Sequence, residues 1–190
     1  MIDILPRLSR EEESALLDLA RRAVAARLES RPLPQLGDPP RRLLMPQGAF
    51  VSFHLHGELR GCVGMILAER PLAETVAACA AASATEDPRF DALQRSELEA
   101  VTIEISALDP PFRVADPTRI NIGIHGLLVT LGRRRGLLLP QVALDQGWDA
   151  RTFLEETCLK AGLPSDAWTK GATVEAFSAQ VFSEGQPTAH

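Results

Sequence analysis

Apolar and polar residues alternate along several short stretches of the chain, which is the pattern of half-buried β-strands. Three such runs cover residues 49–56, 101–108 and 173–182. The polar turn at residues 56–58 connects the first run to a return strand at 59–64, which predicts a β-hairpin. A second hairpin is predicted further along the chain. Its two apolar strands cover residues 126–131 and 136–139, and its turn, one glycine and three arginines, covers residues 132–135.

Three other stretches repeat their apolar residues at helical spacing. The first predicted helix runs from a capping box at Ser9 and Glu12 to about Glu29. The second is rich in alanine and follows Pro71, and the third begins at the N-cap residue Asp149. Helices therefore separate groups of strands that are joined by hairpins.

This order of elements predicts an α+β fold, with a mainly antiparallel sheet and helices packed against it. Residues 31–48 contain five prolines, so we expect an extended connector there. We interpret residues 1–190 as a single domain made of two subdomains, or lobes, with a cleft between them.

Composition narrows the class of protein. The chain has 190 residues, of which 45% are hydrophobic and 24% charged, and a net charge of −5. A net acidic chain with two lysines and no tyrosine makes nucleic-acid binding unlikely. Its three cysteines, Cys62, Cys79 and Cys158, are too scattered for a disulfide scaffold or a structural metal site. With neither a secretion signal at residues 1–9 nor a long apolar run, we expect a cytoplasmic protein.

The first stretch that could carry chemistry is residues 59–64, LRGCVG. Gly61 and Gly64 leave space around the Cys62 sulfur, and Arg60 lies two residues away, on the same face of a regular strand. A nearby guanidinium favours the thiolate over the thiol, which predicts a reactive cysteine or an anion site. The alternative is that Cys62 is a small buried residue and that the glycines mark a bulge.

Two acidic motifs are weaker candidates. Asp87 and Arg89 could frame a polar site near the cysteine, but the same residues also suit a turn that ends a helix. Glu104 lies on the polar side of its strand and could be a site carboxylate or an ion-paired surface residue.

The last candidate is His125, which has Gly123 and Gly126 on either side and could act as a general base. A turn histidine bonded to the backbone is the alternative. His54 and His56 share a strand face without a third ligand, so no metal site is predicted. The sequence has no phosphate-binding loop and no dinucleotide-binding glycine motif, so ATP and NAD have no motif support and the cofactor is left unknown.

Taken together, the motifs resemble those of the AMMECR domain family, known in prokaryotes as AmmeMemoRadiSam system protein A. The resemblance covers about residues 10–185. Seven motifs occur in the family's order: LRGCVG at 59–64, DPRF at 87–90, EISAL at 104–108, IGIHGL at 122–127, LLPQVA at 138–143, GWD at 147–149 and KAG at 160–162. Val63 replaces the family's usual isoleucine.

The resemblance implies a two-lobed α+β fold, with the Cys62 strand in the larger lobe. It also implies an association with Memo-like and radical-SAM proteins, but no particular reaction. Two hypotheses follow. In the first, the chain is an enzyme or enzyme component acting on a small molecule, with Cys62 as nucleophile, Arg60 as anion anchor and His125 as base. In the second, it is a non-catalytic binding module or scaffold for those partners, and less likely one for RNA.

Overall fold

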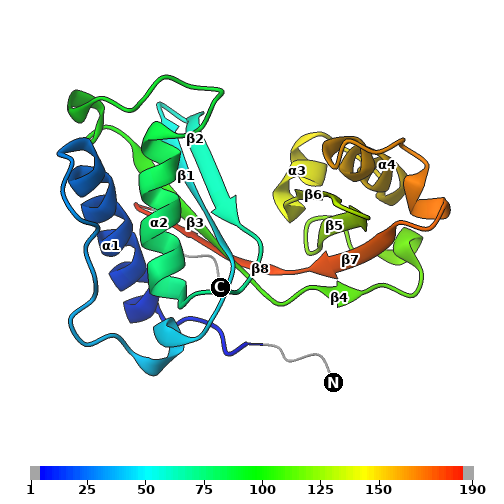
Figure 1. Ribbon diagram of the computed structural model, residues 1–190, viewed down its shortest axis with the longest axis horizontal. Coiled ribbons are helices and arrows are strands. Elements are labelled where there is room, and N and C mark those ends of the chain that lie inside the picture. The colour runs from blue at the N-terminus through cyan, green and yellow to red at the C-terminus, as the bar shows by residue number, and fades with distance from the viewer. Residues whose placement is uncertain (1–4, 186–190) are drawn as a thin grey trace. The chain divides into compact units, whose positions relative to one another are not determined.

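The computed structural model describes residues 5–185, which divide into two compact units. The larger unit comprises residues 5–108 and 180–185, and the smaller unit residues 109–179. Each unit has its own four-stranded sheet and its own apolar core (Figure 1). The strand pairings determined within these sheets are antiparallel. The predicted α+β class is therefore confirmed.

In the larger unit the strand order is β2-β1-β3-β8, with β2 at the edge. Helices α1 and α2 contact each other, and α2 packs on β1 and β2 (Figure 1). Buried residues of the helices and of one sheet face form the core. The elements are α1 (Arg10–Leu28), η1 (Arg41–Leu44), β1 (Ala49–Leu55), β2 (Glu58–Met65), α2 (Leu72–Thr85), η2 (Arg95–Glu97), β3 (Thr102–Leu108) and β8 (Ala179–Ser183).

In the smaller unit the strand order is β4-β7-β5-β6, and α4 packs against β5 and β6. Asp149 caps α4 as predicted, since its side chain accepts a hydrogen bond from the Thr152 amide at 2.7 Å. The elements are β4 (Phe112–Arg113), η3 (Pro117–Arg119), β5 (Gly126–Leu131), β6 (Arg134–Leu138), α3 (Pro140–Asp145), α4 (Ala150–Lys160), η4 (Ala167–Thr169) and β7 (Thr173–Phe177).

Two local predictions were wrong, and one short helix was not predicted. The single strand predicted at 173–182 is two strands, β7 and β8, which join different sheets on either side of Ser178. The apolar positions change phase just before this break, from Val174 and Ala176 to Phe177, Ala179 and Val181, and the single-strand prediction overlooked that change. The second hairpin turns at Gly132 and Arg133 alone, because Arg134 already pairs with Leu131. Helix α3 was not predicted, since its six residues are too few to show a helical period.

Residues 31–48 are irregular except for η1 and for a single bridge from Pro46 to Pro71. This segment lies within the larger unit.

Candidate functional site

Cys62 lies on the edge strand β2, opposite Ser52 of β1. Ser52 in turn pairs with Glu104 of β3. Directly paired residues project from the same face of a sheet, so the three side chains form one row across three strands. Val51, Phe53 and Ile105 alternate with them and pack in the helical core. The row therefore lies on the sheet face opposite α1 and α2, which we call the distal face.

Polar contacts surround Cys62 on three sides. The Ser52 hydroxyl lies 3.2 Å from the Cys62 sulfur and donates a hydrogen bond to it. The Cys62 amide donates to the Asp87 carboxylate at 2.8 Å, and the Cys62 carbonyl accepts from Arg89 at 3.3 Å. The residue that sequence analysis placed between two glycines is thus fixed through both its side chain and its backbone.

Asp87 and Arg89 form a tight pair at the end of α2. Arg89 donates to both carboxylate oxygens, from Nε at 3.0 Å and from Nη2 at 2.7 Å. The side chain of Asp87 is 3% exposed and that of Arg89 is 54% exposed. The Arg89 guanidinium, together with the Cys62 and Arg89 amides, holds the pKa of Asp87 well below its usual range. Asp87 and Arg89 therefore end helix α2 and also bind the backbone of Cys62, and we call this pair the clamp.

Burial raises the pKa of the Cys62 thiol above its ordinary value. The Ser52 hydrogen bond and the Arg89 charge act in the opposite direction, while Asp87 and Glu104 raise the pKa further. The sequence predicts a lowered pKa of Cys62 caused by Arg60. Both parts are wrong, since burial dominates and the cation that acts on the thiol is Arg89.

Arg60 is engaged elsewhere because β2 contains a β-bulge. Phe53 pairs with Gly61 and His54 with Leu59, which leaves Arg60 as the extra residue. The rule that residues two apart share a face does not hold across a bulge. The Arg60 guanidinium binds Glu97 at 2.8 Å and the Asp91 carbonyl at 2.9 Å.

The glycines beside Cys62 admit packed neighbours, which differs from the open space predicted around the sulfur. A Cβ on Gly61 would lie 2.5 Å from the Ser83 carbonyl oxygen, so this glycine lets α2 approach the strand. A Cβ on Gly64 would lie 2.3 Å from the Phe50 ring, which covers that position. The glycines therefore serve packing.

Glu104 is half-buried at the other end of the row. Its charge acts on the Cys62 thiol, yet its carboxylate has no hydrogen-bond or ion-pair partner among residues 5–185.

His125 belongs to the smaller unit, in the loop before β5. Its Nδ1 accepts a hydrogen bond from the Asn121 amide at 3.3 Å, and its ring meets Phe112 edge-on at 5.7 Å. A neutral ring bonded in this way carries its proton on Nε2, so it offers a donor to a ligand. Cys62 and His125 lie in different units, and their convergence stays a prediction.

Ser52 is the residue that sequence analysis missed. Counting outward from the hairpin turn places Gly61 opposite Ser52, and only the bulge at Arg60 brings Cys62 there. Cys79 and Cys158, by contrast, are fully buried, as their helical positions predicted.

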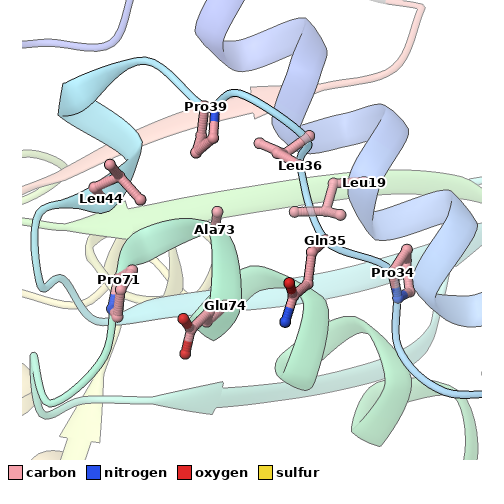
Figure 2. A pocket seen from close by; sticks show the side chains of 9 residues that line it. All are labelled: Leu19, Pro34, Gln35, Leu36, Pro39, Leu44, Pro71, Ala73 and Glu74. Carbon is pink, nitrogen blue, oxygen red and sulfur yellow. The ribbon is translucent and has the colours of Figure 1, made fainter.

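A separate groove of about 120 Å³ lies in the larger unit, away from the predicted site residues. Figure 2 shows side chains from the connector, α1 and the start of α2 around it. Its lining is mostly apolar, with Glu74 and Gln35 as the polar members: Leu19, Pro34, Gln35, Leu36, Pro39, Leu44, Pro71, Ala73 and Glu74.

Two kinds of feature are absent from residues 5–185. No three His, Cys, Asp or Glu side chains in this range cluster in a way that could hold a metal ion. No helix there combines the length and the apolar character needed to cross a bilayer.

The fold and the site define a class: α+β proteins of two units in which a cysteine on a glycine-rich edge strand is clamped by an Asp–Arg pair. The sequence profile of the AMMECR1 family matches residues 17–182. This chain therefore belongs to the AMMECR1 family, and the predicted resemblance is confirmed.

Similar proteins come from several archaea. A protein from Thermofilum pendens is 44% identical, covering 95% of this chain and 93% of its own. Protein MK0488 from Methanopyrus kandleri is 42% identical, covering 95% and 92%. The crystal structure of the uncharacterized protein PH0010 from Pyrococcus horikoshii superposes with a TM-score of 0.89, 36% identity and 95% coverage of both chains. These names state no activity.

Proposed function

We propose that this AMMECR1-family protein is an enzyme, or an enzyme component, that acts on a small molecule through the Cys62 thiol on the distal face. One observation carries the proposal: Cys62 is half-buried and sits within a set of polar groups. A cysteine that only fills space needs no hydroxyl donor and no clamped backbone. Cys79 and Cys158 are examples of such buried residues.

The proposed chemistry is nucleophilic attack by Cys62 on an electrophilic carbon of the substrate. A sulfur–carbon bond forms, the electron pair of the displaced bond goes to the leaving atom, and the thiol proton passes to solvent. Ser52 would stabilise the thiolate by its hydrogen bond, and Arg89 by its charge. Arg89 takes the role that the sequence suggested for Arg60.

The second candidate is a non-catalytic binding module, which could serve Memo-like and radical-SAM partners. The raised pKa of Cys62 favours it, because a thiol that stays protonated is a weak nucleophile. The binding-module hypothesis is also favoured by His125, because its Nδ1 already accepts a hydrogen bond from the Asn121 amide and is not available as a base. For either candidate the three free cysteines suit a reducing compartment, and on that ground we propose a cytoplasmic location.

Screening of a metabolite library against wild type and Cys62→Ser distinguishes the two candidates. Melting temperature reports binding, and mass spectrometry of the incubated library reports turnover. The enzyme hypothesis expects at least one compound to be consumed by wild type and not by Cys62→Ser. Cys158→Ala, which removes a thiol from the smaller unit, is the control and should retain turnover. Compounds that stabilise both proteins without being consumed would favour the binding module.

A further inference from the structure

The charges around Cys62 do not cancel. The thiol is acted on by Arg89, Asp87 and Glu104. Arg89 and Asp87 are bonded to each other through two guanidinium nitrogens, so as a unit they are close to neutral. Glu104 has no such partner among residues 5–185. One negative charge therefore remains unmatched on the distal face, in the same row as the sulfur.

The spacing of this row sets the size of a ligand. Cys62 and Glu104 lie on strands separated by β1, with Ser52 between them. Neighbouring strands are about 4.8 Å apart, so the backbones of the two residues are separated by roughly 10 Å. Both side chains project from the same face, and a molecule of a few bonds' length would reach from one to the other.

We propose that the distal face selects a ligand with a positively charged nitrogen, an amine or a guanidine, which binds Glu104 while its reacting atom lies at Cys62. The ligand's cation would supply the partner that the Glu104 carboxylate lacks, and a charge-assisted hydrogen bond is the strong contact available there. Ser52 lies between the two ends of the ligand. This inference rests on the proposed function only in taking Cys62 as the reacting group.

Charged thiol reagents test this selectivity directly. Three methanethiosulfonates react with the same chemistry but differ in charge: the 2-aminoethyl reagent is a cation, the 2-sulfonatoethyl reagent an anion and the methyl reagent neutral. In each case the thiolate attacks the sulfenyl sulfur, a disulfide forms, and methanesulfinate leaves with the electron pair. Rates at Cys62 are followed by peptide mapping and divided by those of free 2-mercaptoethanol.

Wild type should react with the cation about tenfold faster than with the anion on this normalised scale, as a single unmatched charge at this range allows. The preference should shrink at 0.5 M salt, because salt screens partly exposed charges. Glu104→Gln should abolish it. Glu74→Gln makes the same charge change at the groove, away from Cys62, and should keep the preference. His54 also lies on β1 on the distal face, so His54→Gln is a second control and should keep the preference.

The outcomes separate this inference from the proposed function. A normalised preference for the anion would assign recognition to Arg89 and overturn the inference, as would equal rates for the three reagents. In both cases Cys62 would still be reactive, and the proposed function would stand. If Cys62 reacts with none of the reagents in the native protein, both proposals are overturned.

Discussion

The molecule contains two stretches in which glycines flank a side chain that could act in catalysis. The two side chains differ in the polar groups that hold them. Gly61 and Gly64 flank Cys62 in the larger unit, while Gly123 and Gly126 flank His125 in the smaller. In both stretches the glycines admit packed neighbours. A Cβ on Gly126 would lie 2.4 Å from the Phe177 ring, just as the Gly64 position is covered by an aromatic ring.

The two stretches differ in their polar partners. Cys62 is held by groups that are distant in sequence, among them Asp87, 25 residues away. His125 is held by the Asn121 amide, four residues away, and by an aromatic ring. A side chain fixed by local contacts needs only a turn, whereas long-range polar contacts require the whole unit to fold around the residue. Flanking glycines therefore indicate close packing around a residue. Hydrogen-bond partners that are distant in sequence indicate which of the two residues the fold prepares for chemistry.

The largest expected effect in this comparison is on stability, from Asp87→Ala. The change leaves the Cys62 amide without its acceptor and the Arg89 guanidinium without its carboxylate partner, which costs about 3 kcal/mol for a buried, charge-assisted site. Urea unfolding measures it. Asp18→Ala removes a carboxylate that is 67% exposed and should change stability by less than about 0.5 kcal/mol. Equal effects of the two substitutions would show that the clamp does not stabilise the unit.

The lowered pKa of Asp87 predicts that the free energy of unfolding depends on pH. The pKa of Asp87 is lowered in the folded protein, so its contribution is complete above the unfolded value of about 3.9 and is lost as pH falls toward the folded value. Wild type should therefore lose stability below about pH 4 more steeply than Asp87→Asn. Parallel curves of unfolding free energy against pH would contradict this assignment.

Alanine at the flanking glycines is expected to cost about 2 kcal/mol in either unit. In Gly61→Ala the new methyl group meets the Ser83 carbonyl of α2, and in Gly126→Ala it meets the Phe177 ring and the Leu138 carbonyl. Gly57→Ala is a weaker perturbation, because a Cβ there has open space and only its φ of +85° is unfavourable. Thermal melts compare the three. If Gly61→Ala is harmless while Gly57→Ala is not, packing is not the role of Gly61.

Thiol reactivity should follow exposure. Cys62 is half-buried, whereas Cys79 and Cys158 are inaccessible and burial raises the pKa of Cys79 to about 11. Limiting iodoacetamide should alkylate Cys62 at least about tenfold faster than the others, since thiolate is the reacting form. Arg60→Lys should leave that rate unchanged. Peptide mapping checks both statements, and faster labelling of a buried cysteine would reverse the ordering.

A smaller change in the same assay is expected from Ser52→Ala. Its hydroxyl lowers the pKa of Cys62, so its loss raises that pKa further and slows alkylation a few-fold near pH 8. Ser106→Ala, one pair further along β3 on the same face, is the matched control. An unchanged alkylation profile in Ser52→Ala would mean that the hydroxyl does not act on the thiolate.

The smallest expected effect is from His125→Gln on stability, below about 1 kcal/mol, because only a local hydrogen bond and one ring contact are lost. Denaturant unfolding is the measurement. A loss as large as that of Asp87→Ala would show that His125 is as firmly built into its unit as Cys62, and the contrast between the two stretches would disappear.

The sequence by itself determined the elements that depend on local chemistry. The capping box of α1, the Asp149 cap of α4 and the alternation of β1 and β3 each concern residues within a few positions of one another. Cys62, Asp87 and Glu104 were recognised as candidates because glycine, proline and alternation mark their surroundings. The seven motifs in order also identified the family, which the match over residues 17–182 confirms.

Tertiary structure alone decided which of these residues meet. The bulge at Arg60 shifts the hairpin by one residue, which turns Arg60 toward Glu97 and sets Ser52 opposite Cys62. A one-residue shift exchanges the two faces of a strand, and nothing in the alternating pattern announces it. The assignment of residues 173–182 to two different sheets likewise depends on which strands each half pairs with. Local patterns specify how each segment folds, whereas pairing and the polar contacts around Cys62 are settled only when distant segments pack together.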